Sequence, residues 1–97
     1  MKQEDKTSDM YWERLGFAKA GKLRQTIVCL LLKSQLTPFE IAKETDRDPG
    51  SVSRVIKDLE TNEIIKCMNP TAKKGKIFIL TRDGEKIARE LCRGETS

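Results

Sequence analysis

Residues 49–61 combine two different faces if they form a helix. Apolar residues recur within them at spacings of 3, 1 and 3, which place them on one side of a helix. The opposite side then carries Gly50, Ser53, Arg54 and Lys57, with Ser51 on its flank. Arg54 can donate two hydrogen bonds to a guanine edge, while the serines and Lys57 can reach bases or phosphates. Gly50 leaves the helix N-terminus open to a phosphate. The alternative is an ordinary solvated helix face.

A second basic group follows at residues 66–76, which contain four lysines and no acidic residue. Turn-forming residues at 69–75 separate two apolar runs, 64–68 and 77–80, which pair naturally as a β-hairpin. The lysines at its tip can follow a phosphate backbone or the minor groove of DNA. These tip residues are Lys73, Lys74 and Lys76. Alternatively, the lysines only protect a sheet edge from aggregation.

Two helix-start signals position these side chains. Thr37 can cap a short helix, with a proline at the first helical position and a glutamate completing a capping box. Asp48 and Pro49 repeat the cap-and-proline signal after a tight connection. A short helix, a tight turn and a second helix form a helix-turn-helix, whose second helix enters the major groove. Thr37 can therefore cap its helix and also touch a phosphate.

Three further helices are expected around this unit. A polar tail at residues 1–8, expected to be disordered, precedes a helix that ends before Gly21. The next helix, 22–34, is apolar on most sides and must be covered on most sides. Thr81 caps a last helix. The expected fold class is α+β, mainly α. It is a winged helix-turn-helix with a three-helix core, a hairpin wing and flanking terminal helices, forming one domain over residues 9–97.

The terminal helices carry apolar residues that the central unit does not need. One recognition helix reads only a few base pairs, so a dimer raises both specificity and affinity. We expect a homodimer through Tyr11, Trp12, Leu15, Phe17, Ile87 and Leu91. The alternative is that these residues close the core of the single chain.

Composition limits the other functional classes. The chain has 97 residues, a net charge of +4 and no histidine, glycine-rich phosphate loop or recognisable nucleophile–base pair, so we do not expect an enzyme. The longest apolar run is far too short to span a bilayer. We expect a cytoplasmic protein without membrane partner, metal or other cofactor. Acidic residues dilute the positive charge of the central region, and we expect Glu60 and Glu63 to face away from DNA.

The three cysteines are widely spaced and have no histidine to complete a zinc site. We expect Cys29, Cys67 and Cys92 to be free thiols in or near a reduced core. The alternative is a redox switch at Cys29 or Cys67, which requires an exposed thiol of low pKa.

The helix-turn-helix and wing segments together resemble prokaryotic winged-helix regulators of the ArsR and MarR type, especially small archaeal members. The resemblance covers roughly residues 22–92 and is carried by the runs 36–42, 51–60, 66–70, 73–76 and 80–84. It implies a homodimeric transcriptional regulator on near-palindromic double-stranded DNA. The chain departs from metal-sensing ArsR relatives in lacking histidine, and from typical MarR proteins in lacking long flanking helices.

The resulting hypothesis is a sequence-specific DNA-binding regulator. Its recognition helix is expected at about 49–61, in the major groove, and its wing at about 66–77, on the flanking backbone or minor groove. Two alternatives remain, namely a winged-helix module that binds protein and an architectural binder that ignores DNA sequence.

Overall fold

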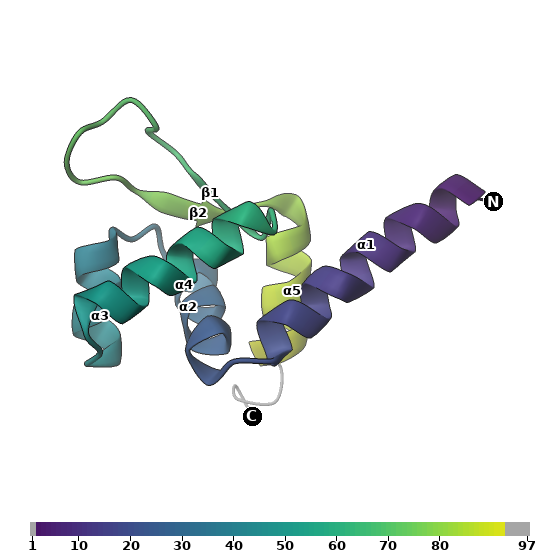
Figure 1. Ribbon diagram of the computed structural model, residues 1–97, viewed down its shortest axis with the longest axis horizontal. Coiled ribbons are helices and arrows are strands. Elements are labelled where there is room, and N and C mark those ends of the chain that lie inside the picture. The colour runs from purple at the N-terminus through teal and green to yellow at the C-terminus, as the bar shows by residue number, and fades with distance from the viewer. Residues whose placement is uncertain (1, 93–97) are drawn as a thin grey trace.

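Five helices and one two-stranded hairpin follow one another along the described part of the chain (Figure 1). The computed structural model describes the backbone of residues 2–92 and the side chains of residues 11–92. In chain order the elements are α1 (Lys2–Lys19), α2 (Lys22–Lys33), α3 (Pro38–Thr45), α4 (Pro49–Thr61), β1 (Ile65–Cys67), β2 (Phe78–Leu80) and α5 (Arg82–Cys92). The expected winged helix-turn-helix is confirmed, with α2, α3 and α4 as its core and the hairpin as its wing.

The first helix begins earlier than the polar composition of its start predicted. α1 starts at Lys2, so residues 2–8 are helical where a disordered tail was expected. Lysine, glutamine and glutamate in this stretch are good helix formers, which explains how the helix can extend through a polar segment.

The two start signals of the helix-turn-helix form as expected. The Thr37 hydroxyl oxygen accepts a hydrogen bond from the Glu40 N–H at 3.2 Å, and the Glu40 carboxylate accepts one from the Thr37 N–H at 2.9 Å. At α4, the Asp48 carboxylate accepts from the Ser51 N–H at 3.1 Å. These bonds satisfy backbone donors that the first turn of a helix leaves unpaired. They also fix where α3 and α4 begin.

The turn after α4 has its left-handed residue at Glu63, one position after the C-cap Asn62. Asn62 has a φ of −86°, and its side-chain amide donates to the Asp58 carbonyl at 2.9 Å. Glu63 takes the left-handed conformation, with a φ of 61°. The Ile64 N–H then bonds back to the Leu59 carbonyl, which closes the turn into the wing.

The wing is a short antiparallel ladder with a third segment at its side. Ile65 pairs with Leu80, and Cys67 pairs with Phe78. The Phe78 N–H also donates to the Leu36 carbonyl at 2.9 Å, which bridges the chain before α3 to the wing. The sequence pattern predicted the two strands but not this bridge, which attaches the wing to the helix-turn-helix.

The core forms around α2. This helix contacts α1, α3, α4, α5 and β2, which supplies the all-round cover that its composition demanded. The largest fully buried side chains are Ile27, Val28, Ile41, Val52, Leu59, Ile64, Ile65 and Ile87. They come from α2, α3, α4, α5, β1 and the turn before β1, so one apolar cluster sets the positions of α4 and the wing.

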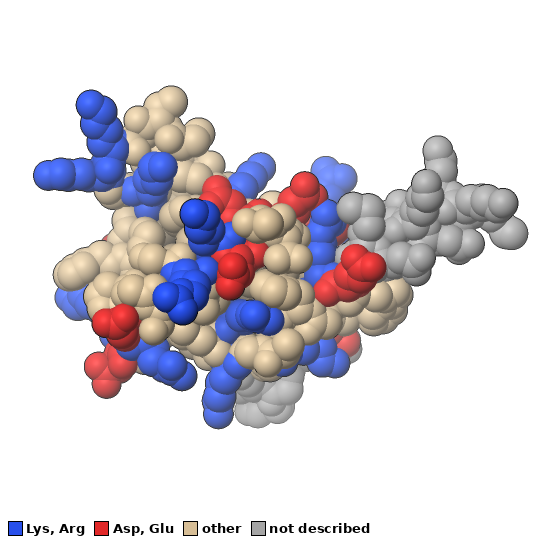
Figure 2. Space-filling model, viewed as in Figure 1, with Lys and Arg blue, Asp and Glu red and all other residues tan. Residues whose placement is uncertain are grey.

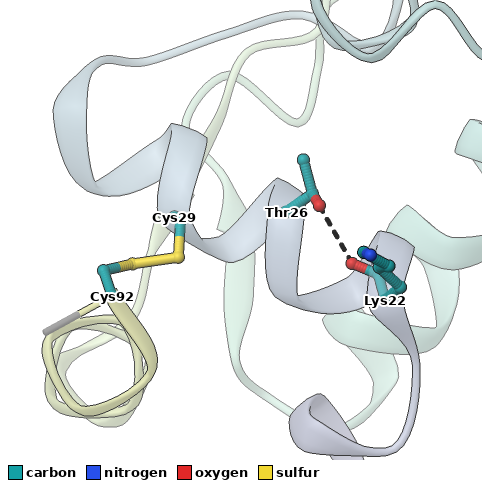
Figure 3. The surroundings of a disulfide bond; sticks show 4 residues. All are labelled: Lys22, Thr26, Cys29 and Cys92. Atoms are coloured by element: carbon teal, nitrogen blue, oxygen red, sulfur yellow. Dashed lines mark hydrogen bonds between the residues drawn. A yellow bond between two sulfur atoms is a disulfide. The ribbon is translucent and has the colours of Figure 1, made fainter. Parts of the chain in front are cut away.

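Two cysteines join α2 to α5 (Figure 3). Cys29 of α2 and Cys92, the last residue of α5, form a disulfide, and their Cα atoms lie 6.0 Å apart. The expectation of three free thiols is wrong for this pair and holds for Cys67, which is half-buried in β1. The cysteines of the pair are 63 residues apart in the chain, and they meet because α5 packs against α2.

Candidate nucleic-acid interface

The outer face of α4 is free of contacts with the core. Val52, Ile56 and Leu59 are buried on its inner side. The residues expected to face DNA are all exposed, and they are Gly50, Ser51, Ser53, Arg54 and Lys57. The helix therefore presents one guanidinium, one ammonium and two hydroxyl groups on a surface that no other described element covers.

The Asp48 cap also favours glycine at position 50. A Cβ atom at this position would come within 2.9 Å of the Asp48 carboxylate oxygen. That carboxylate caps α4, so the absence of a side chain at Gly50 leaves room for the cap as well as for a ligand at the helix N-terminus.

The wing loop is organised by an asparagine that sequence reasoning did not single out. The Asn69 side-chain oxygen accepts from the Ile77 N–H at 2.7 Å, and its amide donates to the Gly75 carbonyl at 3.3 Å. Gly75 has a φ of 66°, which favours glycine. The signal for this role was the Asn-Pro pair at the start of the loop, since asparagine side chains hydrogen-bond nearby backbone in turns.

The expected wing lysines and α4 lie on the same side of the molecule. Lys73, Lys74 and Lys76 are exposed, and Figure 2 shows basic side chains at the projecting wing and over the face that carries α4. Acidic side chains also lie on this face, toward the centre of the view. The folded chain thus brings together two basic groups that are separated in the sequence.

A shallow groove of about 240 Å³ joins the two basic groups. Ser53 and Lys57 line it from α4, and Lys76 lines it from the wing. Its apolar floor includes Ile56 and Phe78. Polar and basic groups at the rim with apolar groups below suit a ligand that offers both phosphates and base edges or methyl groups.

Two acidic residues near the end of α4 have different environments. Glu63 pairs with Arg14 at 2.5 Å, and Arg14 also pairs with Asp83 at 2.6 Å. Arg14 therefore neutralises the charge of the Glu63 carboxylate, and Glu63 does not line the groove. Glu60 lines the groove together with Ser53 and Lys57. Its carboxylate lowers the positive potential at the C-terminal end of the exposed face of α4.

The supporting helix α3 has an unexpected exposed aromatic ring. Thr37 is half-buried and uses its hydroxyl in the capping box, so its cap role is established. Phe39, the second residue of α3, is 69% exposed. It lies two residues, or about 200°, from buried Ile41 on the helix. The Lys43 ammonium lies 5.9 Å from the centre of the Phe39 ring.

The expected dimer residues divide into two groups. Leu15 is 5% exposed and Ile87 is fully buried, so both pack into the core of the single chain. Trp12 is 62% exposed, whereas Tyr11, Phe17 and Leu91 are half-buried around the same core. Burial raises the pKa of the Tyr11 hydroxyl, and the charges of Glu90 and Asp83 add to the shift. This phenol stays neutral near neutral pH.

The described residues offer little for other chemistry. Among the side chains that the structure describes, no three of histidine, cysteine, aspartate and glutamate converge as metal ligands would. No helix in the described range has the length and apolar character needed to cross a membrane.

Comparison with known proteins yields matches in structure alone. No family model and no curated protein sequence matches the chain. Reduced HlyU from Vibrio cholerae matches with a TM-score of 0.80 and 17% identity, over the whole of both chains. The adhesin competence repressor AdcR from Streptococcus pyogenes matches with a TM-score of 0.74 and 22% identity, over 98% of this chain and 72% of that one.

Wild-type ZitR from Lactococcus lactis, solved in complex with DNA, matches with a TM-score of 0.71 and 23% identity. The match covers 76% of this chain and 51% of ZitR, so the chain spans about half the length of the ZitR structures it resembles. At these identities the similarity concerns the fold. The chain therefore shares the winged-helix fold of these proteins.

Proposed function

We propose that this protein is a transcriptional regulator that binds double-stranded DNA through α4 and the wing. The observation that carries the proposal is the groove that Ser53 and Lys57 of α4 line on one side and Lys76 of the wing lines on the other. Arg54 is exposed on the same helix. Hydrogen-bond donors on a free helix combined with flanking cations are what major-groove recognition requires.

Each part of this face has a distinct role in the proposal. Arg54 reads a guanine through two hydrogen bonds, while Ser53 and Lys57 contact neighbouring bases or phosphates. The N-terminus of α4 at Gly50 and Ser51 binds a backbone phosphate through free N–H groups. Thr37 approaches the same backbone from the start of α3. The wing lysines lie on the flanking backbone or in the minor groove.

The structural comparisons support the general class. ZitR was solved in complex with DNA, and AdcR is named a repressor. Membership among ArsR- and MarR-type regulators, the reading of a specific sequence and an archaeal origin rest on the resemblance in sequence. A prokaryotic regulator that binds DNA acts in the cytoplasm, so the proposed function implies a cytoplasmic location.

We further propose that the functional form is a homodimer. Trp12 is exposed on α1. Tyr11 and Phe17 of α1 and Leu91 of α5 are half-buried. A second copy on this surface would cover the indole ring and set two α4 helices on a pseudo-palindromic site. Sedimentation at micromolar protein would give a dimer mass, and Trp12→Ala would lower the dimer fraction if this surface is used.

A selection of bound sequences from random duplexes, followed by titration at several salt concentrations, tests the proposal. Enrichment of one motif, with affinity that falls steeply as salt rises, is the expected outcome. Binding without any sequence preference would favour an architectural role. Absence of binding even at low salt would favour a module that binds another protein.

A further inference from the structure

Glu60 of α4 lies in the same groove as two cations of the proposed DNA-binding face. It lines the groove with Ser53 and Lys57 of its own helix and with Lys76 of the wing. We propose that Glu60 is a specificity-determining residue, whose carboxylate accepts a hydrogen bond from the amino group of a cytosine in the major groove. The inference rests on the proposed DNA-binding function and names one base that the site selects.

Helix geometry places Glu60 on the stripe of α4 that faces the groove. At about 100° per residue, position 60 is turned only about 20° from position 53 and about 60° from position 57. The rise along the helix from Ser53 to Glu60 is about 10 Å, or about three base-pair steps of a duplex. Glu60 is exposed. A duplex that follows this stripe therefore also passes the Glu60 carboxylate.

Three acidic residues near the groove have structural partners. Asp48 caps α4, and Glu40 completes the capping box at the start of α3. Glu63 pairs with Arg14. Among the side chains that the structure describes, none forms an ion pair or a hydrogen bond with the Glu60 carboxylate. Its two oxygens are thus available to a ligand in the groove.

A carboxylate is a selective group on a surface that meets DNA. Its oxygens only accept hydrogen bonds, and the backbone phosphates are anions that repel it. In the major groove it can accept from the amino group of cytosine, whereas thymine has a carbonyl oxygen at the same position. Glu60 therefore opposes phosphates and thymine, and it favours cytosine.

The apolar floor of the groove favours a pyrimidine beside Glu60. Ile56 and Phe78 form this floor, and both are buried. The C5 edge of a pyrimidine makes apolar contacts in the major groove, and it lies next to the amino group of cytosine. Adenine instead presents N7, an acceptor, beside its amino group. A carboxylate next to an apolar floor thus matches cytosine better than it matches the other bases.

The repulsion and the hydrogen bond act together on specificity. Binding that ignores sequence depends on phosphate contacts, so a negative charge in the groove weakens it. A hydrogen bond to cytosine offsets this loss only in the complex with the correct sequence. Because specificity is the difference between two affinities, Glu60 raises it by weakening the wrong complexes and by stabilising the right one.

Selection of bound sequences from random duplexes, with the wild type and with Glu60→Gln, tests the assignment. The wild-type motif should contain a cytosine at a position where the motif of the variant has adenine, because glutamine can bind both N6 and N7 of adenine. The variant should bind a scrambled duplex about fivefold more tightly at low salt, because one repulsive charge is gone. Glu44→Gln is the matched control and should give the wild-type motif, since Glu44 is exposed on α3 and does not line the groove.

A duplex that lacks one amino group isolates the contact. The selected cytosine is replaced by pyrimidin-2-one, which has a hydrogen atom in place of the amino group. The wild type should bind this duplex about tenfold more weakly than the unmodified one, as expected for one base contact, whereas Glu60→Ala should bind both about equally. Any change in the duplex itself affects both proteins, so the comparison cancels it. A duplex with 5-methylcytosine should bind the wild type at least as tightly, because it keeps the amino group and adds a methyl group for the apolar floor.

Several outcomes would overturn the inference. An unchanged motif in Glu60→Gln, or equal gains in affinity for selected and scrambled duplexes, would show that Glu60 acts only as a repulsive surface charge. Equal losses in the wild type and in Glu60→Ala when the amino group is removed would assign the cytosine contact to another residue. These results would leave DNA binding itself intact. Absence of wild-type binding to any duplex would contradict the proposed function as well, so the two failures can be distinguished.

Discussion

Gly84 of α5 lies directly against the backbone carbonyl of Ile64, where the chain leaves α4 and enters the wing. A Cβ atom at position 84 would overlap this carbonyl, and backbone cannot move aside as a flexible side chain can. The contact joins the last helix to the base of the wing without any side chain between them.

Gly84→Ala should therefore destabilise the fold by about 1–3 kcal/mol, the usual cost of overpacking a core. Urea denaturation followed by circular dichroism would measure the loss. Gly16→Ala is the matched control, because Gly16 is exposed within α1 and nothing lies near its would-be Cβ. That change should leave stability unchanged or raise it by up to about 1 kcal/mol. Equal effects of the two substitutions would contradict the proposed close contact.

Arg54→Ala should weaken binding to a selected duplex by about 1–3 kcal/mol and relax the preference at one base pair. Arg54→Lys should keep part of the affinity but lose that preference, since an ammonium cannot form the same planar pair of hydrogen bonds. Fluorescence anisotropy with single-base variants of the duplex measures both quantities. Lys86→Ala, an exposed residue of α5, is the control for charge alone. Arg54 would have no reading role if both alanine variants behaved alike.

The wing lysines should contribute affinity without sequence preference. Lys73→Ala/Lys74→Ala should weaken binding to all duplexes by a similar factor, and the slope of log affinity against log salt should become less steep by about 2. The titration is repeated at several salt concentrations with selected and scrambled duplexes. An unchanged salt slope would indicate that the lysines serve the hairpin and do not contact phosphates.

Arg14 joins α1 to α5 and to the turn after α4 through two ion pairs, and its side chain is 15% exposed. Arg14→Ala should cost about 1–2 kcal/mol of folding stability, because hydrogen bonds between charged groups that are partly shielded are worth more than surface pairs. Arg89→Ala removes a longer, exposed pair with Glu85 and should change stability by less than about 0.5 kcal/mol. Thermal unfolding of both variants tests the difference, and a larger loss from Arg89→Ala would contradict it.

Reduction of the disulfide should lower the free energy of unfolding. A cross-link between cysteines 63 residues apart removes chain entropy from the unfolded state, a stabilisation of about 4 kcal/mol for a loop of this length. Denaturation with and without dithiothreitol measures the change, and Cys67→Ser should show the same dependence on reductant as the wild type. A reductant effect that disappears in Cys67→Ser would point to a different pairing.

Local sequence signals determined most of the secondary structure. The capping residues Thr37 and Asp48 and the turn residues of the wing act within a few positions of themselves, so their hydrogen bonds could be predicted without knowledge of the fold. The exposed face of α4 was predictable for the same reason, because the period of an α-helix fixes which side each residue occupies.

Tertiary structure decided everything that depends on residues distant in the chain. It paired Cys29 with Cys92, placed Arg14 between Glu63 and Asp83, and attached Leu36 to the wing. Apolar character alone could not distinguish Leu15 and Ile87, which are buried, from Trp12, which is exposed. The physical reason is that helix periodicity determines the direction of a side chain from its own axis, whereas the packing of helices against one another determines what it meets there.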